Sequence, residues 1–194
     1  MRLCVLVRHG QSQLNVTRRV NGDPSVPVGL SAQGEAEAAA LAVQLAGIEL
    51  DLCVHTRFER SLRTAELALG DRSVPFAVEP GLDDIDIGEL EGQSIDDYRA
   101  WKRVHQRSDP FPGGESLDAA AVRYADAYER LLGRPERRIV VVCHEIPVRY
   151  AVNAVGGSAD LDGPVHEIRN CVPYLFDADG LETAVVRMRA LAAP

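Results

Sequence analysis

Two short, wholly apolar runs of the sequence each end next to a histidine. Leu3 to Val7 is followed by Arg8 and His9, and Ile139 to Cys143 is followed directly by His144. Both runs have the length of a strand, and continuous apolar runs are typical of strands that are buried on both faces of a sheet. Such sheets are mostly parallel and need helices as crossovers, so this feature favours an α/β architecture.

The segments between these runs have the periodicity of amphipathic helices. Helices are predicted over three ranges: 31–47, about 58–69 and about 116–132. Further strands are predicted at Leu52–Val54, Phe76–Glu79, Val172–Phe176 and Thr183–Met188, with the last two at the sheet edges. This alternation predicts a three-layer α/β/α sandwich with a mainly parallel central sheet.

The chain has 194 residues, of which 46% are hydrophobic and 26% charged, and we expect one compact domain over residues 1–194. The stretch at about 94–114 breaks the alternation, because it mixes a short polar helix with Pro110, Pro112 and a Gly-Gly pair. We therefore predict an insertion or lid over a site there.

Charge and hydropathy exclude several classes of partner. A net charge of −8 argues against binding to nucleic acid or an anionic membrane. No apolar run approaches the ~20 residues of a membrane span, and no signal-peptide cleavage region follows the first apolar run, so we expect a cytoplasmic protein.

None of the four cysteines forms a Cys-x-x-Cys pair, which argues against a metal or disulfide role. The sequence leaves open whether the chain forms a homodimer.

The two histidines predict a catalytic site. In a parallel sheet the carboxyl ends of the strands share one edge, so His9 and His144 should converge there. Either histidine alone would more often be structural, but the pair beside Arg8 favours catalysis. A neutral imidazole is a nucleophile near pH 7, and phosphoryl transfer needs cations around the phosphate. Arg8, beside His9, and Arg60, near the start of the helix predicted at about 58–69, would supply these cations.

Five motifs then resemble one family in its order along the chain. Arg8 to Asn15 resembles the signature of the histidine phosphatase superfamily, also called phosphoglycerate mutase-like. The other matches are Thr56–Arg60 with Thr64–Ala65, Leu82–Gly92, Gly113–Ser116 and Val141–His144. The resemblance spans nearly the whole chain and implies the phosphoglycerate mutase-like fold and a covalent phosphohistidine on His9. It implies no metal and no organic cofactor.

The resemblance also implies roles for further residues. Arg8, Arg60 and His144 would form the phosphate pocket, and Asn15 would donate to the phosphate. Asn21 and Gly22 fall where the family's backbone contacts substrate, although alone they would be read as a turn.

The sequence departs from the family pattern at two acidic positions. The family's proton donor is commonly a glutamate, and the matching residue here is Asp84, with Asp83, Asp86 and Glu89 as rivals. Glu145 stands after the second histidine, where glycine is common. A carboxylate there would repel a phosphate unless it points away, so we interpret Glu145 as a helix-start residue while keeping it among the candidate substrate-binding residues.

The sequence therefore predicts a phosphatase acting on a small phosphorylated metabolite. The alternatives are a cofactor-dependent phosphoglycerate mutase, which in this family carries longer insertions, a non-catalytic phosphate-binding or interaction module, and a metal-dependent hydrolase. The substrate is not identified, because specificity is expected in 94–114, where Tyr98, Trp101 and Phe111 would form an apolar wall. The remaining histidines are expected to be structural or exposed: His55, His105 and His166.

Overall fold

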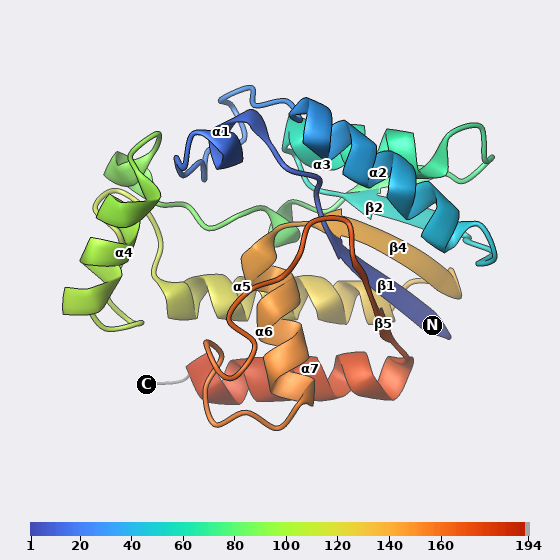
Figure 1. The fold of residues 1–194 in the computed structure, drawn as a ribbon. Helices are drawn as coiled ribbons and strands as arrows, with labels where there is room; N and C mark the ends of the chain where they lie inside the picture. Colours follow the sequence, from blue (N-terminus) through green and yellow to red (C-terminus); the bar gives the residue numbers. More distant parts are fainter. Residues whose placement is uncertain (193–194) are drawn as a thin grey trace.

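The computed structural model describes residues 1–192 and contains a five-stranded central sheet with the order β3-β2-β4-β1-β5 (Figure 1). Its strands are β1 (Leu3–Arg8), β2 (Leu52–His55), β3 (Phe76–Val78), β4 (Arg138–Cys143) and β5 (Pro173–Phe176). β1, β4, β2 and β3 run parallel, and β5 pairs antiparallel with β1. The predicted mainly parallel sheet is confirmed.

The two apolar runs at the centre of the sheet are buried on both faces, as predicted. β1 and β4 pair in register from Leu3 opposite Arg138 to Arg8 opposite Cys143. Val5 and Val7 pack against one helical layer, and Cys4 and Leu6 pack against the other. Because both faces need apolar side chains, the two-residue period of a strand appears in the sequence as one continuous apolar run.

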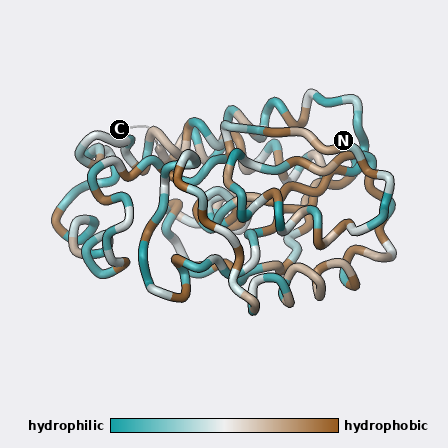
Figure 2. The backbone as a smooth tube through the Cα atoms, turned by 90° about the horizontal axis from the view of Figure 1, so that it is seen from above, coloured by the Kyte–Doolittle hydropathy of each residue, from teal (hydrophilic) through white to brown (hydrophobic). Residues whose placement is uncertain are grey.

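Helices cover both faces of the sheet, which confirms the three-layer sandwich (Figure 1). One layer holds α2 (Ala32–Leu45) and α3 (Glu59–Leu69), and the other holds α5 (Leu117–Leu132), α6 (Glu145–Val155) and α7 (Ala178–Ala192). Ser31 and Ser116 cap α2 and α5 through side-chain bonds to backbone N–H groups. In Figure 2 hydrophobic and hydrophilic residues alternate along the outer helices, whereas the inner strands are hydrophobic over longer stretches.

One predicted edge strand is wrong. Thr183–Met188 lies inside α7, and only the strand at 172–176 exists, as β5. The buried residues of α7 are Leu181, Ala184, Val185, Met188 and Ala192, which follow a helical spacing. The short apolar cluster around Val185 fits either period, and packing against α5 and α6 selects the helix.

The connecting segments gather at the carboxyl end of the parallel strands. They are α1 (Gln13–Val16), the short 3-10 turns η1 (Pro80–Leu82) and η2 (Gly88–Leu90), and α4 (Ile95–Val104). α4 lies to one side, away from the sheet (Figure 1). Arg107, in the same segment, ties it to the body of the molecule by ion pairs with Asp118 and Asp162.

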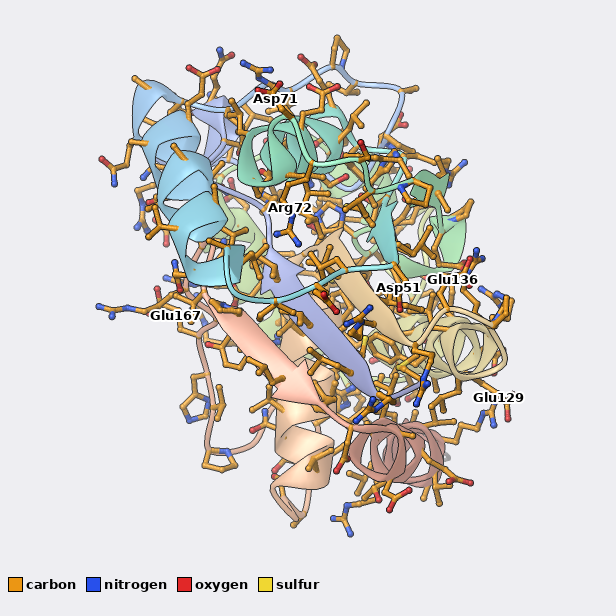
Figure 3. The ribbon with its side chains drawn as sticks, turned by 90° about the vertical axis from the view of Figure 1, so that its right-hand side faces the viewer. Asp51, Asp71, Arg72, Glu129, Glu136 and Glu167 are labelled. Carbon is orange, nitrogen blue, oxygen red and sulfur yellow. The ribbon has the colours of Figure 1, made fainter. Side chains whose placement is uncertain are left out.

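The opposite end of the sheet is held by charged and polar contacts (Figure 3). Asp51, before β2, accepts from Nη2 of Arg138 at 2.9 Å, and Arg72 donates to the carbonyl of Leu45 at 3.0 Å, which joins the ends of α3 and α2. Within residues 1–192, no helix is long and apolar enough to cross a membrane.

Candidate active site

A cavity of about 640 Å³ opens beyond the carboxyl ends of β1 and β4. Most of the residues singled out from the sequence line it: Arg8, His9, Asn15, Asn21, Gly22, Arg60, Asp84 and Glu145. The exception is His144, which is fully buried and contacts two of the lining side chains. The structure thus brings the predicted residues together at the edge where a parallel sheet places its ligands.

His9 is held with one ring nitrogen free of a proton. Its Nδ1 lies 2.7 Å from the carbonyl oxygen of Gly10, which can only accept, so Nδ1 carries the hydrogen and Nε2 keeps its lone pair. Nε2 accepts from Nε of Arg60 at 3.1 Å. Burial lowers the pKa of His9 well below its usual range, and the charges of Arg60 and Arg8 lower it further. His9 is therefore a neutral imidazole with a nucleophilic Nε2 in the cavity.

Close backbone packing fixes the loop that follows His9. A Cβ on Gly10 would lie 2.4 Å from the carbonyl oxygen of Gly34, in the first turn of α2. Only glycine allows this approach. Asn170 donates from its side chain to the carbonyl of His9, so the backbone of His9 is held as well as the loop that follows it.

Arg60 lies in the first turn of α3 and is buried despite its charge. Nη1 donates to Oδ1 of Asn21, Nη2 donates to the carbonyl of Asn21 at 3.2 Å, and Nη2 lies 3.3 Å from Oδ2 of Asp84. Its guanidinium also stacks 4.1 Å from the centre of the Phe58 ring. These contacts keep the cation aimed at His9.

His144 follows β4 as His9 follows β1, and the two ring centres are 5.3 Å apart. Nδ1 of His144 accepts from Nη2 of Arg60 at 3.3 Å, and Nε2 lies 2.9 Å from the Thr56 hydroxyl. Burial lowers the pKa of His144 well below its usual range, with Arg60 and His9 adding to the effect. His144 is therefore a second neutral imidazole beside the first.

Arg8 has a donor without a partner. Its Nη1 donates to the carbonyl of Ile168 at 2.7 Å and forms an ion pair with Glu145 at 2.8 Å. Its Nε is buried and has no hydrogen-bond partner among the described residues. A buried charged donor left unpaired is strongly unfavourable, and Arg8 lines the cavity, so its guanidinium is placed to pair with an anion bound there.

Asp84 is the carboxyl placed to serve as an acid. Its Oδ2 lies 3.3 Å from Nη2 of Arg60 and 3.4 Å from Nδ1 of His144. Burial raises the pKa of Asp84, and this effect exceeds the opposing influence of Arg60. The raised pKa favours the protonated form of Asp84, in which the carboxyl can give up a proton.

The rival acids are placed differently. Asp83 accepts from the backbone and side chain of Arg57, and Asp86 accepts from the N–H of Gly88. Asp86 and Glu89 are exposed. Of the four candidates in the part of the chain that the structure describes, only Asp84 lines the cavity that contains His9.

Glu145 meets one expectation and contradicts another. It is the first residue of α6, as predicted for a helix-start residue. Its side chain does not point away from the site, however, because it lines the cavity and pairs with Arg8 and Arg149. The arginine on the neighbouring strand end draws the carboxylate inward.

Asn15 and Asn21 are each held by hydrogen bonds of their side chains to the protein. Oδ1 of Asn15 accepts from the N–H of Ser12 in the capping box of α1. Glu91 accepts from Nδ2 of Asn21 and from the N–H of Gly22, so the predicted turn is clamped next to Arg60. Glu91 was not among the candidate residues.

The far wall of the cavity comes from the segment in which specificity was expected, but Tyr98 is the only one of its α4 residues that was named from the sequence. One face of α4 lines it with residues at helical spacing: Ile95, Tyr98, Arg99, Lys102 and Arg103. The i, i+3, i+4, i+7 pattern that marks this face is present in the sequence. Arg149, Asp162 and His166 line the cavity too, and no local pattern distinguishes them.

The predicted aromatic wall is wrong in two of its three residues. Tyr98 lines the cavity, whereas Trp101 and Phe111 pack together behind it at a ring distance of 4.2 Å. His55 is buried against the carbonyl of Thr56, and His105 stacks on Trp101, so neither lines the cavity. Within residues 1–192, no group of three or more His, Cys, Asp or Glu side chains is arranged to hold a metal ion.

Known proteins resemble this chain in sequence and in fold. A 2,3-bisphosphoglycerate-dependent phosphoglycerate mutase from Methylobacterium sp. (strain 4-46) is 33% identical over 193 residues, covering 90% of each chain. The crystal structure of a putative alpha-ribazole-5'-P phosphatase from Escherichia coli superposes with a TM-score of 0.80 at 25% identity, covering 91% of this chain and 90% of the other. The alpha-ribazole phosphatase from Shigella flexneri gives a TM-score of 0.79 at 26% identity, covering 90% of each chain.

The family assignment rests on the full length of this similarity. The profile of the histidine phosphatase superfamily (branch 1) matches residues 4–190, which include both strand-end histidines, the two arginines and Asp84. The chain belongs to this superfamily, branch 1.

Proposed function

We propose that the protein is a phosphatase that hydrolyses phosphate monoesters of small metabolites through a covalent phosphohistidine on His9. The observation that carries this proposal is the unprotonated Nε2 of His9 beside two arginines and a carboxyl with a raised pKa, all on one cavity.

The first chemical step transfers the phosphoryl group to the enzyme. Nε2 of His9 forms a bond to phosphorus while the bond from phosphorus to the ester oxygen breaks. Asp84 gives its proton to that oxygen, which leaves as an alcohol. Arg8 and Arg60 stabilise charge on the equatorial oxygens, and His144 accepts from Nη2 of Arg60 and so helps to position it.

The second step returns the enzyme to its starting state. Water attacks phosphorus, the bond between phosphorus and Nε2 breaks, and the Asp84 carboxylate takes a proton from the water. Several residues that line the cavity are exposed, among them Asn15, Arg99 and Arg103, so water can reach the site. The segment at 94–114 would cover the bound substrate as a lid.

Phosphoglycerate mutase activity is the second candidate. Curated relatives about 30% identical have this activity in their names, and the cationic face of α4 would suit a substrate with a carboxylate. Chain length does not separate the two activities, because the alignment covers 90% of the Methylobacterium mutase. The phosphatase hypothesis is supported by the similar solved structures that are named alpha-ribazole phosphatases.

One experiment tests the intermediate. Rapid acid-free quenching with a ³²P-labelled monoester should trap acid-labile, base-stable label on the wild type and none on His9→Ala. Turnover by His9→Ala at the wild-type rate would exclude the covalent mechanism.

A second experiment separates the two activities. The wild type is incubated with a phosphometabolite library that includes 3-phosphoglycerate, with and without 2,3-bisphosphoglycerate, while released phosphate and 2-phosphoglycerate are both followed. Phosphate release without isomerisation is expected. Isomerisation faster than phosphate release would make the protein a mutase.

A further inference from the structure

An acidic side chain faces the part of the cavity proposed to hold phosphate. Oε2 of Glu145 lies 2.8 Å from Nη1 of Arg8, and Oε1 lies 3.4 Å from Nη1 of Arg149. The side chain is 29% exposed, so solvent screens it only in part. A carboxylate placed there repels an anionic ligand, and the proposed reaction steps give it no task.

The charge of Glu145 acts mainly on Arg8. Arg149 is already paired with Asp162 at 2.8 Å. Arg8 and Arg60 line the end of the cavity that is proposed to hold phosphate. The raised pKa of Asp84 means that its carboxyl does not fully neutralise their positive charge. Glu145 therefore removes about half of the formal positive charge that these two arginines present to a phosphate.

We propose that Glu145 compensates the charge of Arg8 and so limits how tightly the cavity holds inorganic phosphate. The inference rests on the proposed function, because it takes this end of the cavity as the phosphate site. Phosphate is bound as substrate and must leave as product, and contacts that hold both equally lower KM without speeding the chemistry. A weaker grip on the product favours its release, which is rate-limiting in many enzymes.

The contacts of Arg8 allow charge to be separated from position. A glutamine at 145 keeps the size of the side chain and an amide oxygen that accepts from Nη1 of Arg8, but it removes the negative charge. Nη1 is also held by the carbonyl of Ile168, so Arg8 has a second anchor in the variant. Structural damage would weaken phosphate binding, whereas removal of the charge should strengthen it.

The test measures phosphate binding without turnover. Calorimetric titration with inorganic phosphate and with orthovanadate is carried out on the wild type, Glu145→Gln, Glu145→Asp and Glu182→Gln. Glu182 is exposed on α7, which contributes no residue to the cavity, so Glu182→Gln makes the same change of charge elsewhere.

Glu145→Gln should bind phosphate about fivefold more tightly or better, which is the scale of one partly screened charge. Its inhibition constant for phosphate and its KM for monoesters should fall together, with kcat unchanged or lower. Glu145→Asp, which keeps the charge, and Glu182→Gln should bind phosphate within about twofold of the wild type.

Three outcomes overturn the inference, and they point to different errors. Unchanged or weaker phosphate binding by Glu145→Gln would reject charge compensation while leaving the phosphatase proposal intact. A loss confined to kcat on alkyl phosphates, with p-nitrophenyl phosphate spared, would make Glu145 a proton donor instead. Failure of the wild type to bind phosphate or vanadate at all would reject both the phosphate site and the role of Glu145.

Discussion

The two ends of the cavity are built in different ways. At the His9 end, the side chains come from the ends of β1 and β4, from α3 and from the loop that carries Asp84. They are mostly buried and contact one another across these elements. At the α4 end, Arg99 and Arg103 are exposed, and neither has a carboxylate partner within residues 1–192. The proposed chemistry therefore depends on side chains at the edge of the sheet, and the proposed substrate recognition depends on α4. Substitutions at the two ends should have separable effects.

The largest expected effect is at the buried end. Arg60→Ala removes a charge-assisted donor at the nucleophile and leaves Asn21 and Asp84 without their partner, so kcat/KM should fall about a hundredfold or more. Arg57→Ala is the matched control, because Arg57 pairs with Asp83 and does not line this cavity. Equal losses in the two variants, measured with p-nitrophenyl phosphate, would show that Arg60 has no special role.

Asp84→Asn should depend on the leaving group. An alkoxide needs a proton as it leaves, so activity on alkyl phosphates should fall by about 10²-fold to 10⁴-fold. p-Nitrophenyl phosphate has a leaving group that needs little protonation, and its loss should be much smaller. Equal losses on both substrates would indicate a positional role, and a negligible loss on both would pass the acid's role to Asp83, Asp86 or Glu89.

Sequence analysis predicted the buried end of the site and the fold because these depend on local patterns. An apolar run followed by a histidine predicts both the strand and the sheet edge at which the histidine lies, and β1 and β4 confirm this placement of His9 and His144. The edge of the sheet was harder to predict, because the apolar cluster in 183–188 fits both the strand period and the helix period. Its packing against the body of the molecule makes this segment a helix.

The α4 end could not be predicted in the same way. That Tyr98 lines the cavity while Trp101 packs behind it depends on how α4 is rotated against the body of the molecule. Lys102 in α4 and Arg107 just after it both pair with Asp162, more than 50 positions later in the sequence, and such long-range pairs leave no periodic signal. The inward turn of Glu145 is similar, because it depends on Arg8, 137 positions earlier in the sequence.

A smaller effect is expected at the α4 end, and it should depend on the substrate. Arg103→Gln removes an exposed cation from the cavity wall, so KM for 4-carboxyphenyl phosphate should rise about threefold to tenfold. KM for phenyl phosphate, whose leaving group is uncharged, should stay within about twofold, and kcat should change little for either substrate. An equal rise in KM for both would mean that Arg103 acts on the phosphate and not on the leaving group.

The smallest effect concerns stability at acid pH, and it contrasts a buried histidine with an exposed one. Burial and the arginines lower the pKa of His9 in the folded protein below 6.5, its ordinary value. The unfolded chain therefore binds a proton at His9 more readily than the folded one, so this contribution to stability is present above pH 6.5 and is lost as pH falls below it. His9→Gln should remove that contribution and lose less Tm than the wild type between pH 7.5 and pH 5. Each kcal/mol corresponds to roughly 2–4 °C in a chain of this size, which differential scanning calorimetry resolves.

The matched control is His105→Gln, an exposed histidine stacked on Trp101, which should follow the wild-type curve. If His9→Gln loses Tm as steeply as the wild type, the buried imidazole is not neutral in the folded state, and the assignment of Nε2 as a ready nucleophile fails with it.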